Sequence, residues 1–482
     1  MTEPLFTGSE WDYEMLYRAI DECSIIAKEE LKLDTYKNQL EIVTSEQMLD
    51  AYASVGMPIF YSHWSFGKKF SRERDLYQKG KRGLAYELVI NSNPCINYLM
   101  EENTACTQVL VIAHAAFGHN HFFKNNSVFC QWTDASGIVD YLVFAKKYIK
   151  DCEDRYGEDE VEKTLDAAHS LMMHGVDRYR RPTKLSLVKE KERQIDRMNY
   201  LEKTINDLWR TLPNAKVKVE KKEEIFPKSP EENLLYFLEK HSPVLTGWQR
   251  EVLRIVRKIA QYFYPQYQTK VMNEGWASFC HYYIMNRLYD KGLLTDGAML
   301  EFIQLHTSVL WQPPYSSKNY SGMNPYYLGF EIFMDIKRIC TDPTEEDKEW
   351  FPQLIGKLWI DVCHDVVINY RDESFIRQHL SPHLIRKLKL FSLENDSNKT
   401  DYFVLAIHDR NGYKHIINKL ADQYEIDAWV PKIEIVDADV KKTRMLILNY
   451  TNNNSRVLSS IHEEVINNIK KLWGHEVSLR SV

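Results

Sequence analysis

The sequence predicts a mainly α-helical protein with a smaller α+β part. We expect a large helical main domain over residues 1–395, followed by a C-terminal ferredoxin-like βαββαβ domain over residues 396–482. Apolar residues recur at helical spacing through most of the first part, whereas short β-branched runs alternate with helical patterns after it. The chain has 482 residues, of which 44% are hydrophobic and 12% aromatic, so both parts have enough apolar side chains for a core.

The N-terminal elements follow from periodicity and capping. Residues 9–35 carry apolar side chains at helical spacing, and Ser45 is suited to cap the N-terminus of a second, short helix. Residues 56–83 are rich in glycine and aromatic residues and predict an ordered loop. Residues 86–91 alternate in the manner of a strand, and a turn containing Pro94 closes it.

A long helix is predicted over residues 95–123. Further helices are predicted over 134–152, 158–175, 230–240, 246–263, 297–310, 325–341 and 345–370. The segment 183–228 is dense in charge and predicts a charged arm, composed of a protruding helix and a solvated connector. A basic arm that binds a partner is the alternative interpretation of the same segment.

The C-terminal pattern predicts strands and helices in the order βαββαβ. They are expected at 402–408, 413–423, 433–436, 444–450, 453–473 and 476–480. This order matches the ferredoxin-like split unit. Ligand sensing or partner binding is the expected use of such a domain, by analogy of fold alone.

Composition excludes several classes of protein. The net charge of −6 implies no general attraction to nucleic acid, and the eight cysteines form no CxxC pair, as is usual in a reducing cytoplasm. The N-terminal residues have neither the basic nor the apolar region of a signal peptide. The longest apolar run, Val109–Phe117, is far shorter than the roughly 20 residues of a membrane span. We expect a cytoplasmic protein with no membrane span.

The segment from Val271 onward predicts a buried helix that carries two ionisable residues. Glu274 and His281 are seven residues apart, so they lie two turns apart on one helical face. A buried carboxylate costs several kcal/mol unless a cation or donors compensate it. The pattern therefore indicates a metal site or an acid–base site. The alternative is that Glu274 pairs with an arginine and His281 bonds a backbone carbonyl.

His114, His119 and His121 fall within eight residues and, with Glu274, are the candidate metal ligands. Imidazole and carboxylate together are the usual ligands of zinc and of non-haem iron. Residues five apart in a regular helix lie about 140° apart, so Gly118 must break or bulge the helix if His114 and His119 share an ion. We prefer these two histidines to His121, which is two turns from His114.

Other polar residues are candidates for orienting the ligands. Asp166 and His169 are three residues apart, like the Glu-x-x-His element of di-iron bundles, although a surface or helix-packing pair explains them as well. The residues expected to contact the metal ligands rather than the metal are His281, Asp166, His169 and Asn273.

Two short segments resemble the gluzincin metallopeptidases. These are Val111-Ile-Ala-His114 and Asn273-Glu-Gly-Trp-Ala277. The resemblance implies a zincin-like metal-site core in which Glu274 is the third ligand. This chain departs from the pattern, because Ala115 stands where the catalytic glutamate belongs and the second histidine comes one residue late. The expected replacements for the missing base are the acids a few turns before His114, namely Glu101 and Glu102.

A second resemblance spans nearly the whole chain. The residues that carry it are Tyr86-Glu-Leu-Val-Ile-Asn91, Asn93-Pro-Cys95, Met100-Glu-Glu-Asn-Thr104, Gly118-His-Asn120, Phe122-Phe-Lys-Asn-Asn126, Gly175-Val-Asp-Arg-Tyr179, Thr269-Lys-Val-Met-Asn-Glu-Gly-Trp-Ala277, Met285-Asn-Arg-Leu-Tyr289, Asn324-Pro-Tyr326 and Asp372-Glu-Ser-Phe-Ile376. They resemble the SpoVR family (stage V sporulation protein R). The resemblance implies a bacterial cytoplasmic protein linked to assembly of the spore's peptidoglycan cortex. In bacteria without spores it implies a stress-response role beside a serine protein kinase and a von Willebrand A-type protein, which are the expected partners.

Two functions remain open at this point. The first is a metal-dependent hydrolase with a divalent ion, zinc being the expected one, acting on a peptide or a cell-wall-related substrate. The second is a non-catalytic regulator or scaffold whose cluster of histidines and carboxylates is structural and whose partners bind the C-terminal domain and the charged arm. Ala115 favours the second, and the concentration of buried ionisable residues favours the first. No nucleotide cofactor is expected.

Overall fold

The computed structural model describes most of the chain. The described residues are 3–53, 61–78, 87–178, 226–227, 229–315, 317–318, 320–394, 403–406, 408–439, 443–451 and 461–481. The charged arm expected over 183–228 lies outside the described residues, apart from residues 226 and 227. The chain forms two compact units, Met1–Glu162 with Gln261–Val430, and Lys163–Ala260 with Pro431–Val482. The division expected at residues 395 and 396 stays a prediction.

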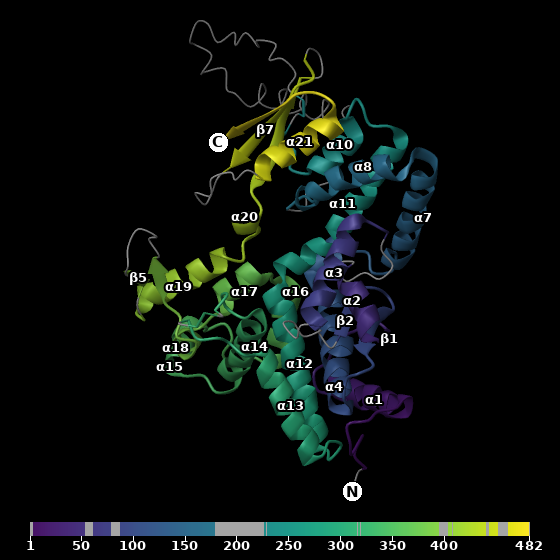
Figure 1. The fold of residues 1–482 in the computed structure, drawn as a ribbon. Coiled ribbons are helices and arrows are strands. Elements are labelled where there is room, and N and C mark those ends of the chain that lie inside the picture. Colours follow the sequence, from purple (N-terminus) through teal and green to yellow (C-terminus); the bar gives the residue numbers. More distant parts are fainter. Residues whose placement is uncertain are drawn as a thin grey trace, which may run out of the picture. The chain divides into compact units, whose positions relative to one another are not determined.

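The first unit is mainly helical (Figure 1). Its helices are α1 (Tyr13–Glu29), α2 (Ser45–Ala53), α3 (Trp64–Gln78), α4 (Ala105–Val111), η1 (Ile112–His119), α5 (Asn120–Asn125), α6 (Ser127–Trp132), α7 (Ile138–Tyr156), α12 (Lys270–Asp290), α13 (Asp296–Val309), α14 (Pro325–Thr341), α15 (Glu345–Trp350), α16 (Trp359–Asn369), α17 (Asp372–His379), α18 (Pro382–Lys387), α19 (Arg410–Asp422) and α20 (Ile426–Trp429). Its strands are β1 (Asn38–Val43), β2 (Glu87–Ile90), β3 (Cys95–Met100), β4 (Ser392–Glu394) and β5 (Phe403–Ala406).

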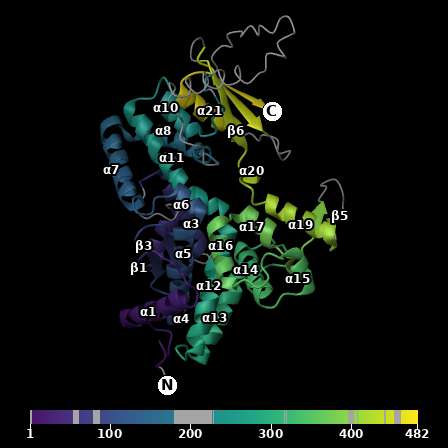
Figure 2. The same ribbon diagram turned by 180° about the vertical axis from the view of Figure 1, so that it is seen from behind.

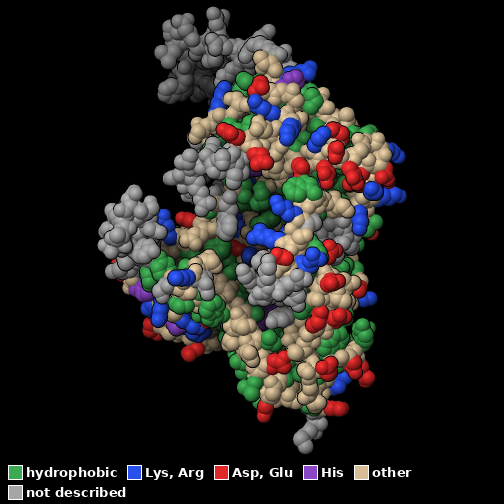
Figure 3. Space-filling model, in the orientation of Figure 1, with side chains coloured by type: hydrophobic (Ala, Val, Ile, Leu, Met, Phe, Trp, Pro, Cys, Tyr) green, Lys and Arg blue, Asp and Glu red, His purple; other side chains and the backbone are tan. Residues whose placement is uncertain are grey.

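The second unit combines helices with a small sheet. Its elements are η2 (Met172–His174), α10 (Leu234–His241), β6 (Lys432–Ala438), β7 (Leu446–Thr451), α21 (Ile461–Trp473) and β8 (Val477–Ser481). Two helices, α8 (Glu158–Ser170) and α11 (Gly247–Gln268), run from one unit into the other. On the face drawn in Figure 3, acidic and basic side chains are interspersed over most of the described surface.

Helix α12 is central to the first unit, and its main packing partners are η1 and α14. Figure 2 shows α12 beside α14. Apolar side chains cover nearly its whole circumference, which is why its sequence lacks a polar face. Trp276 and Phe279 are fully buried on it and pack against Phe333 of α14. A helix that is apolar all round is expected to be buried in the core of a large protein.

Small residues allow α12 to approach both neighbours closely. A Cβ atom added at Gly118 of η1 would lie 2.6 Å from Cα of Ala277. On another side of α12, a Cβ atom on Gly275 would collide with the backbone of Gly329 in α14. The sequence Asn273-Glu-Gly-Trp-Ala277 therefore contains, around the candidate ligand Glu274, the two small residues that permit these crossings.

A three-stranded sheet, in the order β1-β3-β2, packs beside η1. Strand β3 pairs in parallel with β1 and antiparallel with β2. The helix predicted over 95–123 is therefore wrong at its start, because residues 95–100 form the central strand. Thr104 caps the helix that follows, its side chain accepting the N–H of Thr107. The apolar residues of 95–100 fit the helical period as well as the strand period. Pairing with the neighbouring strands makes the segment a strand.

Two other local predictions need correction. The loop expected over 56–83 contains helix α3 in its described part. The single helix expected over 345–370 is two helices, α15 and α16, separated by a short irregular segment in which Gly356 has a φ of +74°. Residues with positive φ interrupt a right-handed helix, and glycine adopts that conformation without strain.

The C-terminal prediction is confirmed only in its element types. Strand β5 pairs with β4, whereas β6, β7 and β8 form a separate three-stranded sheet in the second unit. Among the described strands, no sheet contains all four that a ferredoxin-like unit needs, so that fold is not confirmed. Within the described parts of the chain, none of the helices combines the length and the apolar character that crossing a bilayer requires.

Candidate metal centre

His114 and His119 face one another because the chain between them is a π-helix. Element η1 spans Ile112–His119, and the rings of the two histidines have centroids 4.6 Å apart. In a π-helix the hydrogen bonds join residues five apart, so such residues lie roughly on one face. The departure from α-helical geometry that the five-residue spacing demanded is therefore present, and it includes Gly118.

Two carboxylates from other elements complete the cluster. Oε2 of Glu274, on α12, lies 3.4 Å from Nε2 of His119 and 3.8 Å from Nε2 of His114. Oε1 of Glu87, the first residue of β2, lies 3.4 Å from Nε2 of His114. One ligand atom each from Glu87, His114 and His119 lie within 4.8 Å of one another, and both histidines are buried.

The spacing of these atoms fits one tetrahedral ion. Zinc binds imidazole nitrogen and carboxylate oxygen at about 2.0–2.1 Å, so two ligand atoms in a tetrahedral site lie about 3.4 Å apart. The distances of 3.4 Å and 3.8 Å from Glu274 to the two histidines agree with this value. They are longer than ordinary hydrogen bonds between nitrogen and oxygen.

The hydrogen bonding of Glu274 also fits a cation. Its Oε2 is a buried atom with no hydrogen-bond partner among the described residues. Burial raises the pKa of the Glu274 carboxyl, but the facing imidazoles of His114 and His119 outweigh that effect and hold the pKa well below its usual range. An anionic oxygen without a donor, beside two imidazole nitrogens, is the donor set of a divalent metal such as zinc.

For Glu87 the effect of burial is the larger one. It raises the pKa of the Glu87 carboxyl above its usual range, the charge of Glu274 adds to the rise, and the nearby histidines oppose it. The two carboxylates of the cluster therefore differ, one being held as an anion and the other being able to take up a proton.

Each histidine of the pair is held by a hydrogen bond at its other nitrogen. Nδ1 of His119 bonds Oδ1 of Asn273 at 2.8 Å. Nδ1 of His114 bonds Nδ1 of His281 at 2.8 Å, and Nε2 of His281 bonds Nδ1 of His306 at 2.7 Å. Burial lowers the pKa of His281 well below its usual range and that of His306 to about 4, so both rings are neutral near pH 7.

These bonds couple the tautomers of the linked rings. If Nδ1 of His114 donates its proton to His281, then Nε2 of His114 has its lone pair free towards Glu274. His281 then carries its proton on Nε2 and donates it to His306. Fixing the tautomer of a histidine through its second nitrogen is the usual way in which proteins prepare it for a metal. The structure thus brings Asn273 and His281 into contact with the predicted ligands.

The remaining predicted residues lie elsewhere. Nδ1 of His121 meets the backbone of Asp34, while burial lowers its pKa to about 3. Glu101 and Glu102 are exposed in the turn after β3, where Glu102 accepts the Ser45 N–H. The two predicted residues on α8 belong to the second unit and are absent from the cluster; they are Asp166 and His169.

Two residues of the cluster were not identified from the sequence. The strand pattern over residues 86–91 assigns no role to Glu87, and no motif of the sequence includes His306. The available signal for Glu87 was a lone acid in an otherwise apolar, alternating run. A lone acid in such a run also fits a residue on the opposite face of a sheet, with no functional role. Only tertiary packing places β2 beside η1.

Comparison with known proteins agrees with the resemblance drawn from the motifs. Residues 10–429 match the family model described as "SpoVR like protein", and residues 431–482 match the "SpoVR-like C-terminal domain". The chain belongs to the SpoVR family. This SpoVR protein is 53% identical over 479 residues to "Uncharacterized protein YcgB" of Escherichia coli (strain K12), which covers 99% of this chain and 94% of the relative. No solved structure matches it significantly. The local resemblance to gluzincins is not confirmed by these comparisons.

Proposed function

We propose that this SpoVR protein is a metal-dependent hydrolase with a degenerate zincin-like centre. In this proposal His114, His119 and Glu274 hold a zinc ion. The observation that carries it is the buried Oε2 of Glu274, which has no hydrogen-bond partner among the described residues and lies 3.4 Å and 3.8 Å from the two imidazoles. A zinc ion held there would act as a Lewis acid towards a carbonyl oxygen and would acidify water.

Glu87 takes the role of general base in this proposal. It reaches the cluster from β2, at 3.4 Å from His114, and replaces the acid that is missing beside His114 in the sequence. A base is most effective when its pKa is near the working pH, and the raised pKa of Glu87 supports the assignment. Its carboxylate would accept a proton from water and later return one to the leaving group.

The substrate class follows from the family rather than from the site. We propose an amide bond in a peptide or a cell-wall-related molecule, in keeping with a role in spore-cortex formation or, in bacteria without spores, in stress response. Hydrolysis of such a bond requires polarisation of the carbonyl and a base for water, and the cluster offers groups for both.

The test separates metal binding from catalysis. Protein produced without a metal-binding tag should contain about one equivalent of zinc by mass spectrometry. Glu274→Ala should lose the metal, whereas Glu87→Gln should keep it and lose hydrolysis of a peptide library and of peptidoglycan fragments. Glu102→Gln, which changes an exposed glutamate outside the cluster, is the matched control. Loss of activity in Glu102→Gln with Glu87→Gln unaffected would move the base to the residue that the sequence suggested.

A second candidate is a non-catalytic regulator or scaffold that acts with a serine protein kinase and a von Willebrand A-type partner. Ala115 favours it, because this residue leaves His114 without the neighbouring acid that zincin catalysis uses, and both histidines are nearly inaccessible. Metal retained in the wild type together with no hydrolysis of any amide substrate would support this candidate. In that case the ion would stabilise the packing of η1 on α12.

A further inference from the structure

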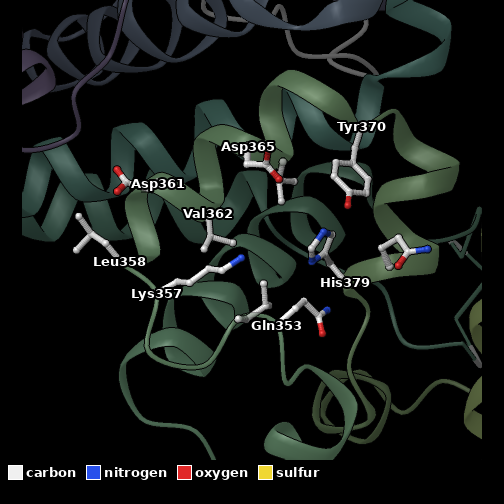
Figure 4. A pocket seen from close by; sticks show the side chains of 11 residues that line it. Gln353, Lys357, Leu358, Asp361, Val362, Asp365, Tyr370 and His379 are labelled. Atoms are coloured by element: carbon white, nitrogen blue, oxygen red, sulfur yellow. The ribbon is translucent and has the colours of Figure 1, made fainter.

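A pocket outside the metal centre lies between the segment before α16, the face of α16 and the end of α17. Its volume is about 370 Å³, at the lower end of the range for small-molecule sites. Figure 4 shows the side chains around it. Four aliphatic residues line part of its wall: Leu354, Leu358, Val362 and Val366. Polar residues from several elements complete the lining.

His379 is the most informative residue of this pocket. It is only 5% exposed, and neither of its ring nitrogens has a hydrogen-bond partner among the described residues. Its ring packs against Tyr370 and Phe375, with centroids 5.1 Å and 6.0 Å away. Burial lowers the pKa of His379 to about 4, so the ring is neutral near pH 7 and offers one donor and one acceptor.

An unpaired imidazole of this kind is unfavourable for folding. Buried polar groups are nearly always hydrogen-bonded, and each exception needs an explanation. Here the ring lines a pocket, and Figure 4 shows the Lys357 side chain extending towards it, with the Tyr370 hydroxyl and the Gln353 amide nearby. A molecule bound in the pocket would provide these groups with hydrogen-bond partners.

The charges around the pocket define what that molecule carries. Asp361 faces Lys32 at 3.3 Å, so its charge is already compensated. Asp365 accepts a hydrogen bond from Asn369 but faces no cation within ion-pair distance in the described structure. Lys357 also lines the pocket, and no described carboxylate lies within ion-pair distance of it; both Lys357 and Asp365 are exposed to solvent. One cation and one anion therefore remain, beside an aliphatic wall and a neutral imidazole.

We propose that this pocket binds a free α-amino acid with an aliphatic side chain. Its carboxylate would be bound by the Lys357 ammonium and the Tyr370 hydroxyl, and its ammonium by Asp365. Its side chain would lie on the aliphatic wall, and His379 would pair with the polar end of the molecule. The site is separate from the metal centre, and the inference does not depend on hydrolase activity.

Calorimetric titration of the full-length protein with three probes tests the proposal. L-leucine carries both charges, 4-methylpentanoate only the carboxylate, and 3-methylbutylamine only the ammonium. L-leucine should bind at least tenfold more tightly than either of the others. Absence of binding by L-leucine at millimolar concentration, or equal binding by a probe with one charge, would overturn the proposal.

Two variants locate the binding site. Lys357→Met keeps the length of the side chain and removes its charge, and it should weaken L-leucine binding at least tenfold. His379→Phe keeps an aromatic ring and removes two unpaired nitrogens. It should leave the thermal midpoint unchanged or raise it while weakening binding. Lys348→Met, at an exposed position outside the pocket, is the matched control and should bind normally. Wild-type affinity in Lys357→Met and His379→Phe would refute the site.

Discussion

Replacing Gly118 by alanine should separate η1 from α12 and weaken the metal centre. The new Cβ would lie 2.6 Å from Cα of Ala277 and 3.0 Å from its Cβ. Carbon atoms in contact are normally about 3.5–4.0 Å apart, so the two elements would have to separate by about 1 Å. No flexible side chain is available to absorb this displacement, because the nearest contact is with the backbone of Ala277.

The cost of the substitution can be worked from two opposing effects. Overpacking a core typically costs about 1–3 kcal/mol, whereas alanine is favoured over glycine in a helix by about 1 kcal/mol. The net loss of stability should therefore be at most about 2 kcal/mol, and the protein should still fold. The metal centre should suffer more. Nε2 of His119 and Oε2 of Glu274 are 3.4 Å apart, and a separation of about 4.4 Å exceeds the span of two zinc bonds.

Zinc affinity measured by competition with a fluorescent chelator is the direct assay. Gly118→Ala should bind zinc at least tenfold more weakly than the wild type and unfold at a slightly lower temperature. Gly247→Ala is the matched control, because a Cβ there meets nothing within 4 Å; stability should stay constant or rise by up to about 1 kcal/mol. Wild-type zinc affinity in Gly118→Ala would show that the close approach does not position the ligands.

Three further predictions concern single residues. Removing metal with a chelator should lower the thermal midpoint of the wild type and leave that of Glu274→Ala almost unchanged, because only the wild type gains stability by binding the ion; equal shifts would contradict the site. His281→Ala should reduce zinc affinity about 10–100-fold without removing a ligand, since it leaves Nδ1 of His114 unpartnered; an unchanged affinity in the chelator competition would argue against this role. Asp372 accepts the N–H groups of Val271 and Met272, but burial raises its pKa from 3.8 to about 7. As the pH rises, the Asp372 carboxyl loses its proton in the unfolded chain before it does so in the folded protein. The contribution of Asp372 to the free energy of unfolding is therefore full below about pH 4. It falls by up to about 1.4 kcal/mol per pH unit until about pH 7. The free energy of unfolding of Asp372→Asn should not show this fall between about pH 4 and pH 7. Identical pH profiles of unfolding free energy for the wild type and the variant would refute the assignment.

The elements that depend on local pattern could be predicted from the sequence. Helix α12 was expected because its apolar residues leave no polar face, and a buried carboxylate within it indicated a site. The spacing of His114 and His119 indicated a departure from α-helical geometry, and η1 provides it. In both cases the information lies within about twenty consecutive residues.

The parts that depend on tertiary packing could not be predicted. Residues 95–100 are apolar enough for a helix, and only their pairing with β1 and β2 makes them a strand. Glu87 joins the metal centre because β2 lies beside η1, a contact between segments whose proximity no local pattern encodes. Glu101 and Glu102 were preferred for their position in the sequence, yet they lie on the exposed turn at the end of β3.

The same geometry explains why restoring the missing acid beside His114 should fail. Ala115 is 1% exposed and lies within η1, where the backbone is already committed to π-helical hydrogen bonding. A glutamate at this position would bury a carboxylate, at a cost of several kcal/mol unless a cation compensates it. Ala115→Glu should therefore unfold at a markedly lower temperature and gain no hydrolase activity, whereas Ala115→Ser should be milder because the added group is small and neutral. A stable, more active Ala115→Glu would show that position 115 reaches the ion, and that the base belongs there rather than on β2.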